Sequence, residues 1–231
     1  MQGNVDAQNK IGWLYKEGKG VKKDYKKAFE WYEKSAKQGD SNGQMYLGYM
    51  YYHGYGVIKD YKKAFEWYHK SAIQGNARGQ EYVGYMYEEG KGVTQDDKKA
   101  FEWYKKSAKQ EKSSAQYILG VMYQRGKGVT QDDKKAFKWY EKSANRGYYN
   151  LGWMYEYGKG IPKDYKKAFE LYLKSAKQGF SYSQQKIGWM YEYGKGVPKN
   201  HKKAFEWYQK AQKNGYKNID EAIDRVKMYI P

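Results

Sequence analysis

The chain has 231 residues, with 44 Lys and Arg against 26 Asp and Glu, a formal net charge of +18 and no cysteine. The absence of cysteine excludes disulfides, thiolate catalysis and sulfur-ligated zinc or iron. A mean hydropathy of -1.16 with 29 Tyr and 8 Trp indicates a thin structure whose apolar side chains often carry a polar group. The positive charge serves either solubility or the attraction of anionic partners. No stretch reaches the roughly 18–20 apolar residues of a membrane span.

Internal repetition decides the predicted architecture. A five-residue pattern of an aliphatic residue, Gly, a variable residue, Met or Leu, and Tyr occurs at residues 11–15, 47–51, 83–87, 119–123, 151–155 and 187–191. We call its glycine the marker glycine; it occupies positions 12, 48, 84, 120, 152 and 188, so the spacing is 36 residues except for one step of 32. A period of this length is typical of solenoid proteins.

Each repeat predicts two antiparallel helices, helix A around the marker glycine and helix B after a Gly-x-Gly loop. In residues 24–36, small or apolar residues follow the i, i+3, i+4, i+7 spacing of one helix face. Predicted N-caps of helix B are Asp24, Asp60, Asp164 and Asn200. Predicted left-handed C-terminal glycines are 18, 54, 90, 126, 158 and 194 after helix A, and 39, 75, 147, 179 and 215 after helix B, with Glu111 at this place in the third repeat.

The marker glycine lies inside helix A, where glycine costs about 1 kcal/mol relative to alanine. Six such costs predict that a neighbouring helix passes too close to admit a Cβ atom.

The repeated pattern, Ala-x-x-Leu-Gly-x-Met-Tyr-x-x-Gly-x-Gly-Val followed by Asp-x-x-Lys-Ala-Phe-x-Trp-Tyr-x-x-Ser-Ala, resembles the Sel-one-like repeat over roughly residues 5–215. This family is related to tetratricopeptide repeats. The resemblance implies an all-α, right-handed superhelix of about six helix pairs, with the A helices lining its concave surface. It also implies a role as a non-enzymatic scaffold or adaptor for other proteins.

The two ends of the array differ in the sequence. Residues 1–215 are predicted to form the repeats and 216–231 a C-terminal capping helix, because residues 218–221 resemble a capping box and residues 219, 222, 223, 226 and 229 form an apolar stripe. The first residues have no signal-peptide core, and residues 2–4 match the helix-B end at 74–76. We therefore expect a soluble fragment of a longer protein, in a compartment that the sequence does not indicate.

The 32-residue step lacks four residues at the start of one helix A. A deletion of four residues nearly preserves the helical phase. The alternative is that residues are missing from the sequence between Tyr148 and Tyr149. We favour this alternative slightly, because the repeat pattern resumes in mid-helix at Tyr149.

Nothing in the sequence predicts catalysis, a metal or a cofactor. The Gly-x-Gly loops lack the strand and the third glycine of a dinucleotide fingerprint and the Gly-Lys-Ser/Thr ending of a phosphate loop. Residues 183–186 match Ser-x-x-Lys only once and without companion motifs. His53, His69 and His201 have no second ligand at metal-binding spacing.

The best candidate for partner binding is the outward side of helix A. A helical wheel places positions +1 and +4 from the marker glycine opposite the core side. Aromatic or acidic residues at these positions make good anchors for a protein or peptide, although rings there could equally pack between adjacent A helices. The candidate residues are Trp13, Tyr49, Tyr52, Tyr85, Glu88, Trp153, Glu156, Trp189 and Glu192.

A second candidate surface is a row of lysines in the first turn of each helix B. Each helix B carries a Lys-Lys pair, and stacked repeats would align the first lysines into a ridge: Lys26, Lys62, Lys98, Lys134, Lys166 and Lys202. The ridge is either a solvated face or a binding site for nucleic acid, acidic glycan or lipid, whose affinity would fall steeply with salt.

Overall fold

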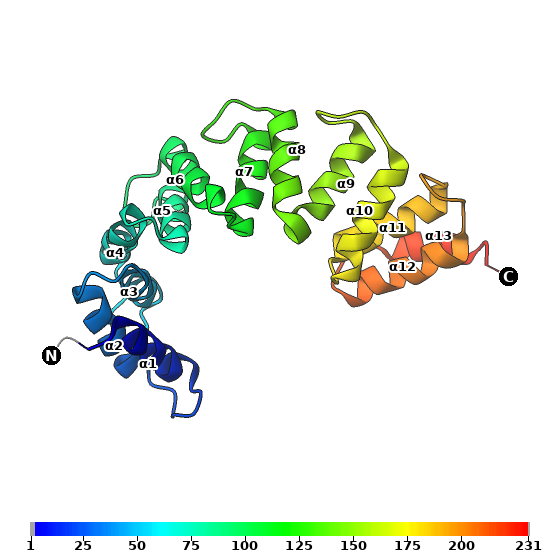
Figure 1. Cartoon of the computed structure of the whole chain (residues 1–231). Helices are drawn as coiled ribbons and strands as arrows, with labels where there is room; N and C mark the ends of the chain where they lie inside the picture. The colour runs from blue at the N-terminus through cyan, green and yellow to red at the C-terminus, as the bar shows by residue number, and fades with distance from the viewer. Residues whose placement is uncertain (1–2, 231) are drawn as a thin grey trace. The chain divides into compact units, whose positions relative to one another are not determined.

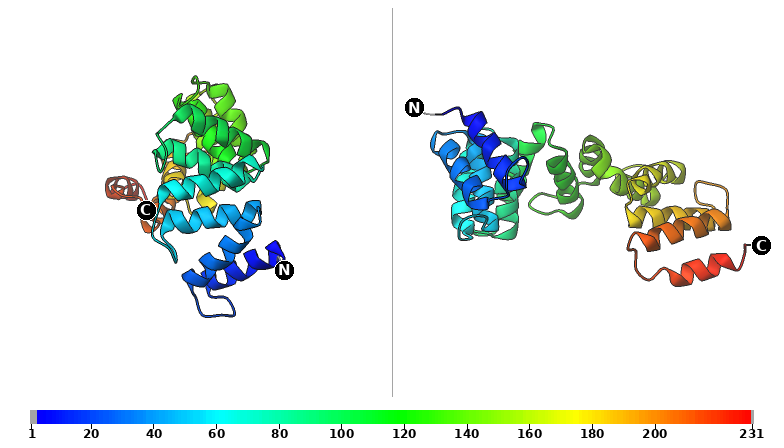
Figure 2. Two further views of the ribbon diagram at one scale, coloured as in Figure 1. Left: turned by 90° about the vertical axis from the view of Figure 1, so that its left-hand side faces the viewer. Right: turned by 90° about the horizontal axis from the view of Figure 1, so that it is seen from below.

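The computed structural model describes residues 3–230, and within that range every regular element is a helix. The helices form two compact units, residues 1–130 and 131–231. The predicted all-α solenoid of helix pairs is confirmed in each unit: consecutive helices pack against one another along the chain, as Figures 1 and 2 show.

Unit 1 contains three complete helix pairs and a seventh helix. Its elements are α1 (Val5–Glu17), α2 (Tyr25–Lys37), α3 (Ser41–His53), α4 (Tyr61–Ile73), α5 (Ala77–Glu89), α6 (Asp97–Lys109) and α7 (Ser113–Arg125). The odd-numbered helices are A helices and the even-numbered helices are B helices. Neighbouring A helices also touch directly, α1 with α3 and α3 with α5.

Unit 2 begins with a helix B and ends with the C-terminal helix. Its elements are α8 (Asp133–Lys142), the 3-10 helix η1 (Ala144–Gly147), α9 (Tyr148–Tyr157), α10 (Tyr165–Lys177), α11 (Ser181–Tyr193), α12 (His201–Lys213) and α13 (Asp220–Lys227). Figure 2 shows α12 and α13 side by side at the C-terminal end of this unit.

The predicted caps are largely confirmed. Asp24, Asp60, Asp164 and Asn200 each accept a hydrogen bond from the backbone N–H three residues later. The glycines that follow helix A are all left-handed. After helix B the prediction is wrong at Gly147, whose φ is -86°.

The marker glycines are required by a ring of helix B. A Cβ atom on Gly48 would lie 2.7 Å from Cδ1 of Tyr68, and one on Gly188 would lie 2.5 Å from Cδ1 of Tyr208. Real Cβ atoms essentially never approach so closely. The same contact occurs at Gly12, Gly84 and Gly152, with Tyr32, Tyr104 and Tyr172, which confirms the predicted close packing.

The second glycine of the Gly-x-Gly loop joins one repeat to the one before it. Gly92 has φ +68°, and a Cβ atom there would overlap the carbonyl of Tyr61 at the start of the preceding helix B. Gly56, Gly128, Gly160 and Gly196 make the equivalent contact. The sequence pattern predicted only that these loops end the helix, and it did not predict this contact between repeats.

The 32-residue step is accommodated by shortening two helices. The other helices of the repeats have 13 residues each, whereas α8 and α9 have ten each. Ala144 takes the positive φ (49°) expected of Gly147, and η1 connects directly to α9, in which Tyr148 and Tyr149 are consecutive.

The C-terminal helix is shorter than the predicted stripe. Ile219 and Val226 are buried against α12, whereas Tyr229 is exposed. No side chain caps α13, and Asn218 takes a left-handed backbone (φ 58°) instead of forming the predicted capping box. Gln2, part of the predicted N-terminal match, and Pro231 lie outside the described residues.

Candidate functional site on the A helices

The aromatic residues predicted at position +1 remain partly exposed. Trp13, Tyr49, Tyr85, Trp153 and Trp189 are all half-buried. Two lysine ammonium groups, from Lys10 and Lys19, lie 4.4 and 4.8 Å from the Trp13 ring. We call the surface formed by these residues and their neighbours on the A helices the helix-A face.

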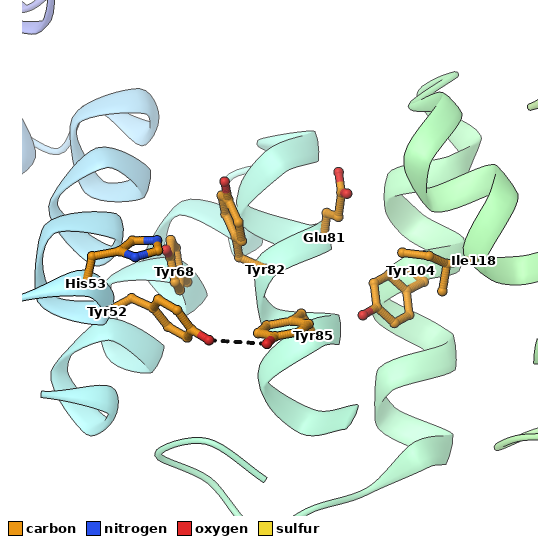
Figure 3. Close-up of a pocket in the computed structure, with 8 residues that line it drawn as sticks. All are labelled: Tyr52, His53, Tyr68, Glu81, Tyr82, Tyr85, Tyr104 and Ile118. Atoms are coloured by element: carbon orange, nitrogen blue, oxygen red, sulfur yellow. Dashed lines mark hydrogen bonds between the residues drawn. The ribbon is translucent and has the colours of Figure 1, made fainter. Parts of the chain in front are cut away.

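The helix-A face of unit 1 contains a cavity of about 350 Å³. Figure 3 shows its walls, which come mainly from α3 and α5 with one residue from each of α4, α6 and α7. The lining residues are Tyr52, His53, Tyr68, Glu81, Tyr82, Tyr85, Tyr104 and Ile118. We call it the aromatic cavity.

A lysine from the following loop fixes two of the cavity's tyrosines. The hydroxyls of Tyr52 and Tyr85 lie 3.2 Å apart (Figure 3), and the Lys91 ammonium donates to both, at 2.8 and 2.9 Å. These hydrogen bonds raise the pKa of Lys91. Burial raises the pKa of Tyr52 despite the nearby ammonium, and the shared lysine holds the two rings in place.

The acidic residues predicted for partner binding face inward. Glu156 and Glu192 are only 3% and 4% exposed. Glu156 accepts hydrogen bonds from the Tyr172 hydroxyl and from Lys186 of the next repeat. Its carboxylate is therefore used inside the fold.

Glu192 and Glu88 repeat this arrangement. Glu192 accepts from the Tyr208 hydroxyl (2.6 Å) and from Arg225 Nε (2.5 Å). Burial alone would raise the pKa of Glu192, but the hydrogen bonds from Arg225 and Tyr208 outweigh it and lower the pKa.

In unit 1, Glu88 accepts from the Tyr104 hydroxyl and from Lys127, both at 2.8 Å. Position +4 thus joins helix A, helix B and the following repeat. The three glutamates at this position, 88, 156 and 192, therefore make structural contacts within the fold.

A family model for the Sel1 repeat matches the chain six times, at residues 5–40, 41–76, 77–112, 113–148, 146–180 and 181–216. Together these matches cover most of the sequence. The chain belongs to the Sel1 repeat family. Sel1 repeats generally form protein-interaction scaffolds and are typically not enzymes.

Two solved structures are similar in sequence and fold. The chain is 36% identical to c5321, a protective antigen of uropathogenic Escherichia coli with an SLR fold, with a TM-score of 0.89. The match covers 99% of this chain and 50% of that one, so this chain spans half the length of the antigen. A Sel1 repeat protein of Oxalobacter formigenes is 35% identical, with a TM-score of 0.84 over 91% of this chain and 88% of that one. No curated protein matches the chain.

The Lys-Lys pairs of the Sel1 repeats divide into two kinds of lysine. The second lysine is held by the fold: Lys63 and Lys167, for example, pair with the N-cap aspartates Asp60 and Asp164 and lie over tyrosine rings of helix A. The first lysine is exposed in every repeat and makes none of these contacts in the described part of the chain. These first lysines are Lys26, Lys62, Lys98, Lys134, Lys166 and Lys202.

Charge is divided between the two helices of the Sel1 repeat. The six B helices hold 24 basic and 9 acidic residues, a net charge of +15. The six A helices hold 5 basic and 7 acidic residues, a net charge of -2. The net charge of +18 is therefore concentrated on helix B and the loops.

Several residues that line the aromatic cavity, and a buried network of amide side chains, were not predicted from the sequence. Glu81 and Tyr82 line the aromatic cavity at positions -3 and -2 from the marker glycine. The residue type at these two positions changes from repeat to repeat, so the repeat pattern did not mark them as functional. Gln80 donates to the Ala72 carbonyl of the preceding helix B and accepts from Gln110. The recurrence of glutamine at 8, 44, 80 and 116 was a signal for this contact.

Neither a metal cluster nor a membrane span is found among residues 3–230. No group of three or more His, Asp or Glu side chains there could hold a metal ion. None of the described helices is long and apolar enough to cross a bilayer.

Proposed function

We propose that this Sel1 repeat protein is a non-enzymatic adaptor whose helix-A face binds an extended segment of a partner protein. The observation that carries the proposal is the aromatic cavity in unit 1. Cavities of about 300–1,000 Å³ with apolar walls and a few polar groups are typical ligand sites, and 350 Å³ suits one or two partner side chains.

The chemistry of the walls supports a protein ligand. Tyrosine supplies a large apolar area at low entropic cost together with a hydroxyl, and it is common at the centre of protein interfaces. Tyr82 stacks on Tyr68 with ring centroids 4.6 Å apart, and Lys91 fixes Tyr52 and Tyr85. The walls therefore need little ordering when a partner binds.

Unit 2 offers a related surface on its own A helices. Trp153 contacts Tyr157 and Trp189 contacts Tyr193, with ring centroids 5.2 and 5.6 Å apart. The two tyrosines are about half exposed. We propose Trp153 and Trp189 as further anchors for the partner.

The test is affinity capture from a lysate of the source cells at moderate and high salt. The wild type is compared with a Tyr85→Ala/Trp153→Ala/Trp189→Ala variant, after circular dichroism has shown that both are folded. A matched control, Trp31→Ala/Trp67→Ala/Trp207→Ala, removes three half-buried aromatic residues of helix B. A partner retained at high salt, lost in the first variant and kept by the control is the expected result; equal capture by all three proteins would contradict the proposal.

A second candidate function is the binding of a polyanion by the exposed first lysines. The charge of +15 on the B helices favours it. If it holds, the logarithm of the affinity for a labelled single-stranded DNA falls linearly with the logarithm of the salt concentration. Replacing the six first lysines by Gln would then weaken binding and flatten that slope, while unchanged binding would exclude the ridge.

A further inference from the structure

The walls of the aromatic cavity carry one charged group. Among its lining residues, Glu81 is the single carboxylate, and no Lys or Arg lines it. The remaining lining residues are five tyrosines, one histidine and one isoleucine. Burial, together with Lys59 and Lys16, lowers the pKa of His53, so the imidazole is neutral at pH 7 and the wall is negative.

The carboxylate of Glu81 is held in place but not neutralised. Its Oε2 accepts a hydrogen bond from Ser114 Oγ at 2.8 Å. The ion pairs of the described residues do not include Glu81, although the chain has 44 Lys and Arg. Glu88, about two helical turns after Glu81, is paired with Lys127.

The tyrosine rings that line the aromatic cavity together with Glu81 make it suited to a cation. Aromatic ring faces attract ammonium and guanidinium groups, and arginine also stacks on them. At the edge of the cavity Lys91 already lies 5.4 and 5.0 Å from the ring centroids of Tyr52 and Tyr85. Its ammonium is bonded to their hydroxyls and does not line the cavity, so it leaves Glu81 unpaired.

We infer that the aromatic cavity binds the basic side chain, arginine or lysine, of a partner segment. The alkyl part of that side chain packs against the tyrosine rings and Ile118, and its cationic head meets the Glu81 carboxylate. Figure 3 shows the residues that would form this site. The inference rests on the proposed function, since it specifies which side chain the helix-A face selects. The net charge of +18 repels a basic partner side chain at long range. Binding of that side chain therefore depends on a short-range contact such as the one with Glu81.

The test uses the folded full chain with ¹³C-labelled isoleucine δ1 methyl groups. Ile118 lines the cavity, while Ile58 and Ile73 are exposed elsewhere, at 88% and 64%, and report nonspecific binding. The probes are N-acetyl-arginine methylamide and the citrulline analogue, in which a neutral urea replaces the guanidinium. Titrations are made at about 0.15 M salt, where the Debye length is about 8 Å.

The variants separate the carboxylate from the overall charge. Glu81→Gln removes the charge from the cavity, and Ser114→Ala removes the hydrogen bond that holds the carboxylate. Glu89→Gln is the matched control, because Glu89 is exposed on the same helix and does not line the cavity. All variants are first compared with the wild type by circular dichroism.

We expect the arginine probe to shift the Ile118 methyl signal with saturation, and to bind about tenfold more tightly than the citrulline probe. Glu81→Gln should remove that preference, Ser114→Ala should reduce it, and Glu89→Gln should keep it. Equal binding of the two probes, or a preference unchanged in Glu81→Gln, would overturn the inference while leaving the cavity as a side-chain site. If neither probe moves Ile118 relative to Ile58 and Ile73, both the inference and the observation behind the proposed function fail.

Discussion

At the scale of single residues, the fold depends on one buried tyrosine in each helix B. Tyr172 and Tyr208 are fully buried, with the ring against a marker glycine and the hydroxyl bonded to a glutamate at position +4. The hydroxyl of Tyr32 has no partner among the described residues, because position +4 of the first repeat is Lys16. The strength of this contact therefore varies from repeat to repeat.

The Glu156 contact provides a first prediction. Glu156→Gln should lower the free energy of unfolding by about 2–3 kcal/mol, because it removes charged hydrogen bonds to Tyr172 and leaves Lys186 without its counterion. Urea denaturation followed by circular dichroism measures the change. Glu170→Gln, at an exposed position on α10, should change stability by less than about 0.5 kcal/mol. Equal effects of the two variants would contradict the structural role of Glu156.

His69 provides a second prediction, on pH. It lies beside Phe65 and Trp103, with ring centroids at 5.8 and 5.5 Å, and burial followed by the charge of Lys106 lowers its pKa. In the unfolded chain the pKa of His69 is near 6.5, so the unfolded chain binds the proton more readily than the folded chain does. The stability due to His69 is therefore complete above about pH 6.5 and is lost as pH falls through the lower folded pKa.

Wild type should accordingly lose stability relative to His69→Phe between pH 7.5 and pH 5, as measured by urea denaturation at several pH values. An NMR titration gives the folded pKa of His69 directly. A value at or above 6.5 would refute the prediction.

The predictions about single residues were correct at positions where nearly every repeat has the same type of residue. The marker glycines and the N-cap aspartates recur almost unchanged, so periodicity predicted both their place and their role. Position +4 alternates between Lys, Tyr, Gln and Glu, and a helical wheel cannot show that Glu156 turns toward Tyr172 in the next helix. The lining residue Glu81 was missed for the same reason.

At the scale of elements, the Gly-x-Gly loop is the connection between successive repeats. In the loop at residues 90–92, the first glycine ends helix A. The middle residue, Lys91, donates a hydrogen bond to Tyr52 of the preceding helix A, and the second glycine lies against the preceding helix B. Sequence periodicity located the loop, but the contact depends on how repeats stack, which no single repeat specifies.

The loop gives a third prediction with a control inside the same chain. Gly20 and Gly92 have φ +73° and +68°, but a Cβ atom on Gly20 meets nothing within 4 Å, whereas one on Gly92 would overlap the Tyr61 carbonyl. Gly20→Ala should cost about 1–2 kcal/mol from the left-handed backbone alone. Gly92→Ala should cost roughly 1–3 kcal/mol more because the two repeats must separate. Denaturation of both variants under identical conditions checks the difference, and equal costs would exclude the inter-repeat contact.

At the scale of the whole molecule, the chain consists of two units with their own cores. In unit 1 the cores are built around Tyr32 and Tyr68, and in unit 2 around Tyr172 and Tyr208. The sequence predicted a solenoid of repeats throughout, but the grouping into units 1–130 and 131–231 was not predicted, because the boundary lies in an ordinary Gly-x-Gly loop. The assignment of residues 1–215 and 216–231 to an array and a cap stays a prediction.

The cores of unit 1 give a fourth prediction. Stability in repeat proteins is approximately a sum over repeats and their interfaces, and about three repeats are needed. Residues 1–130 should therefore fold alone, with a helical circular dichroism spectrum and a cooperative urea transition. The shorter fragment 1–76 should be much less stable. A non-cooperative transition for residues 1–130 would contradict the independence of this unit.

The most direct test of the central claim, that the helix-A face binds a partner segment, is site-specific photo-crosslinking in a lysate of the source cells. p-Benzoylphenylalanine replaces His53, an exposed residue that lines the aromatic cavity, or Glu66, an exposed residue of the B helix α4 that does not line it. We expect a discrete protein crosslinked from position 53 and not from position 66, with the crosslinked partner peptide containing an arginine or lysine. Crosslinks that form from position 66 alone, or equally from both positions, would contradict the account.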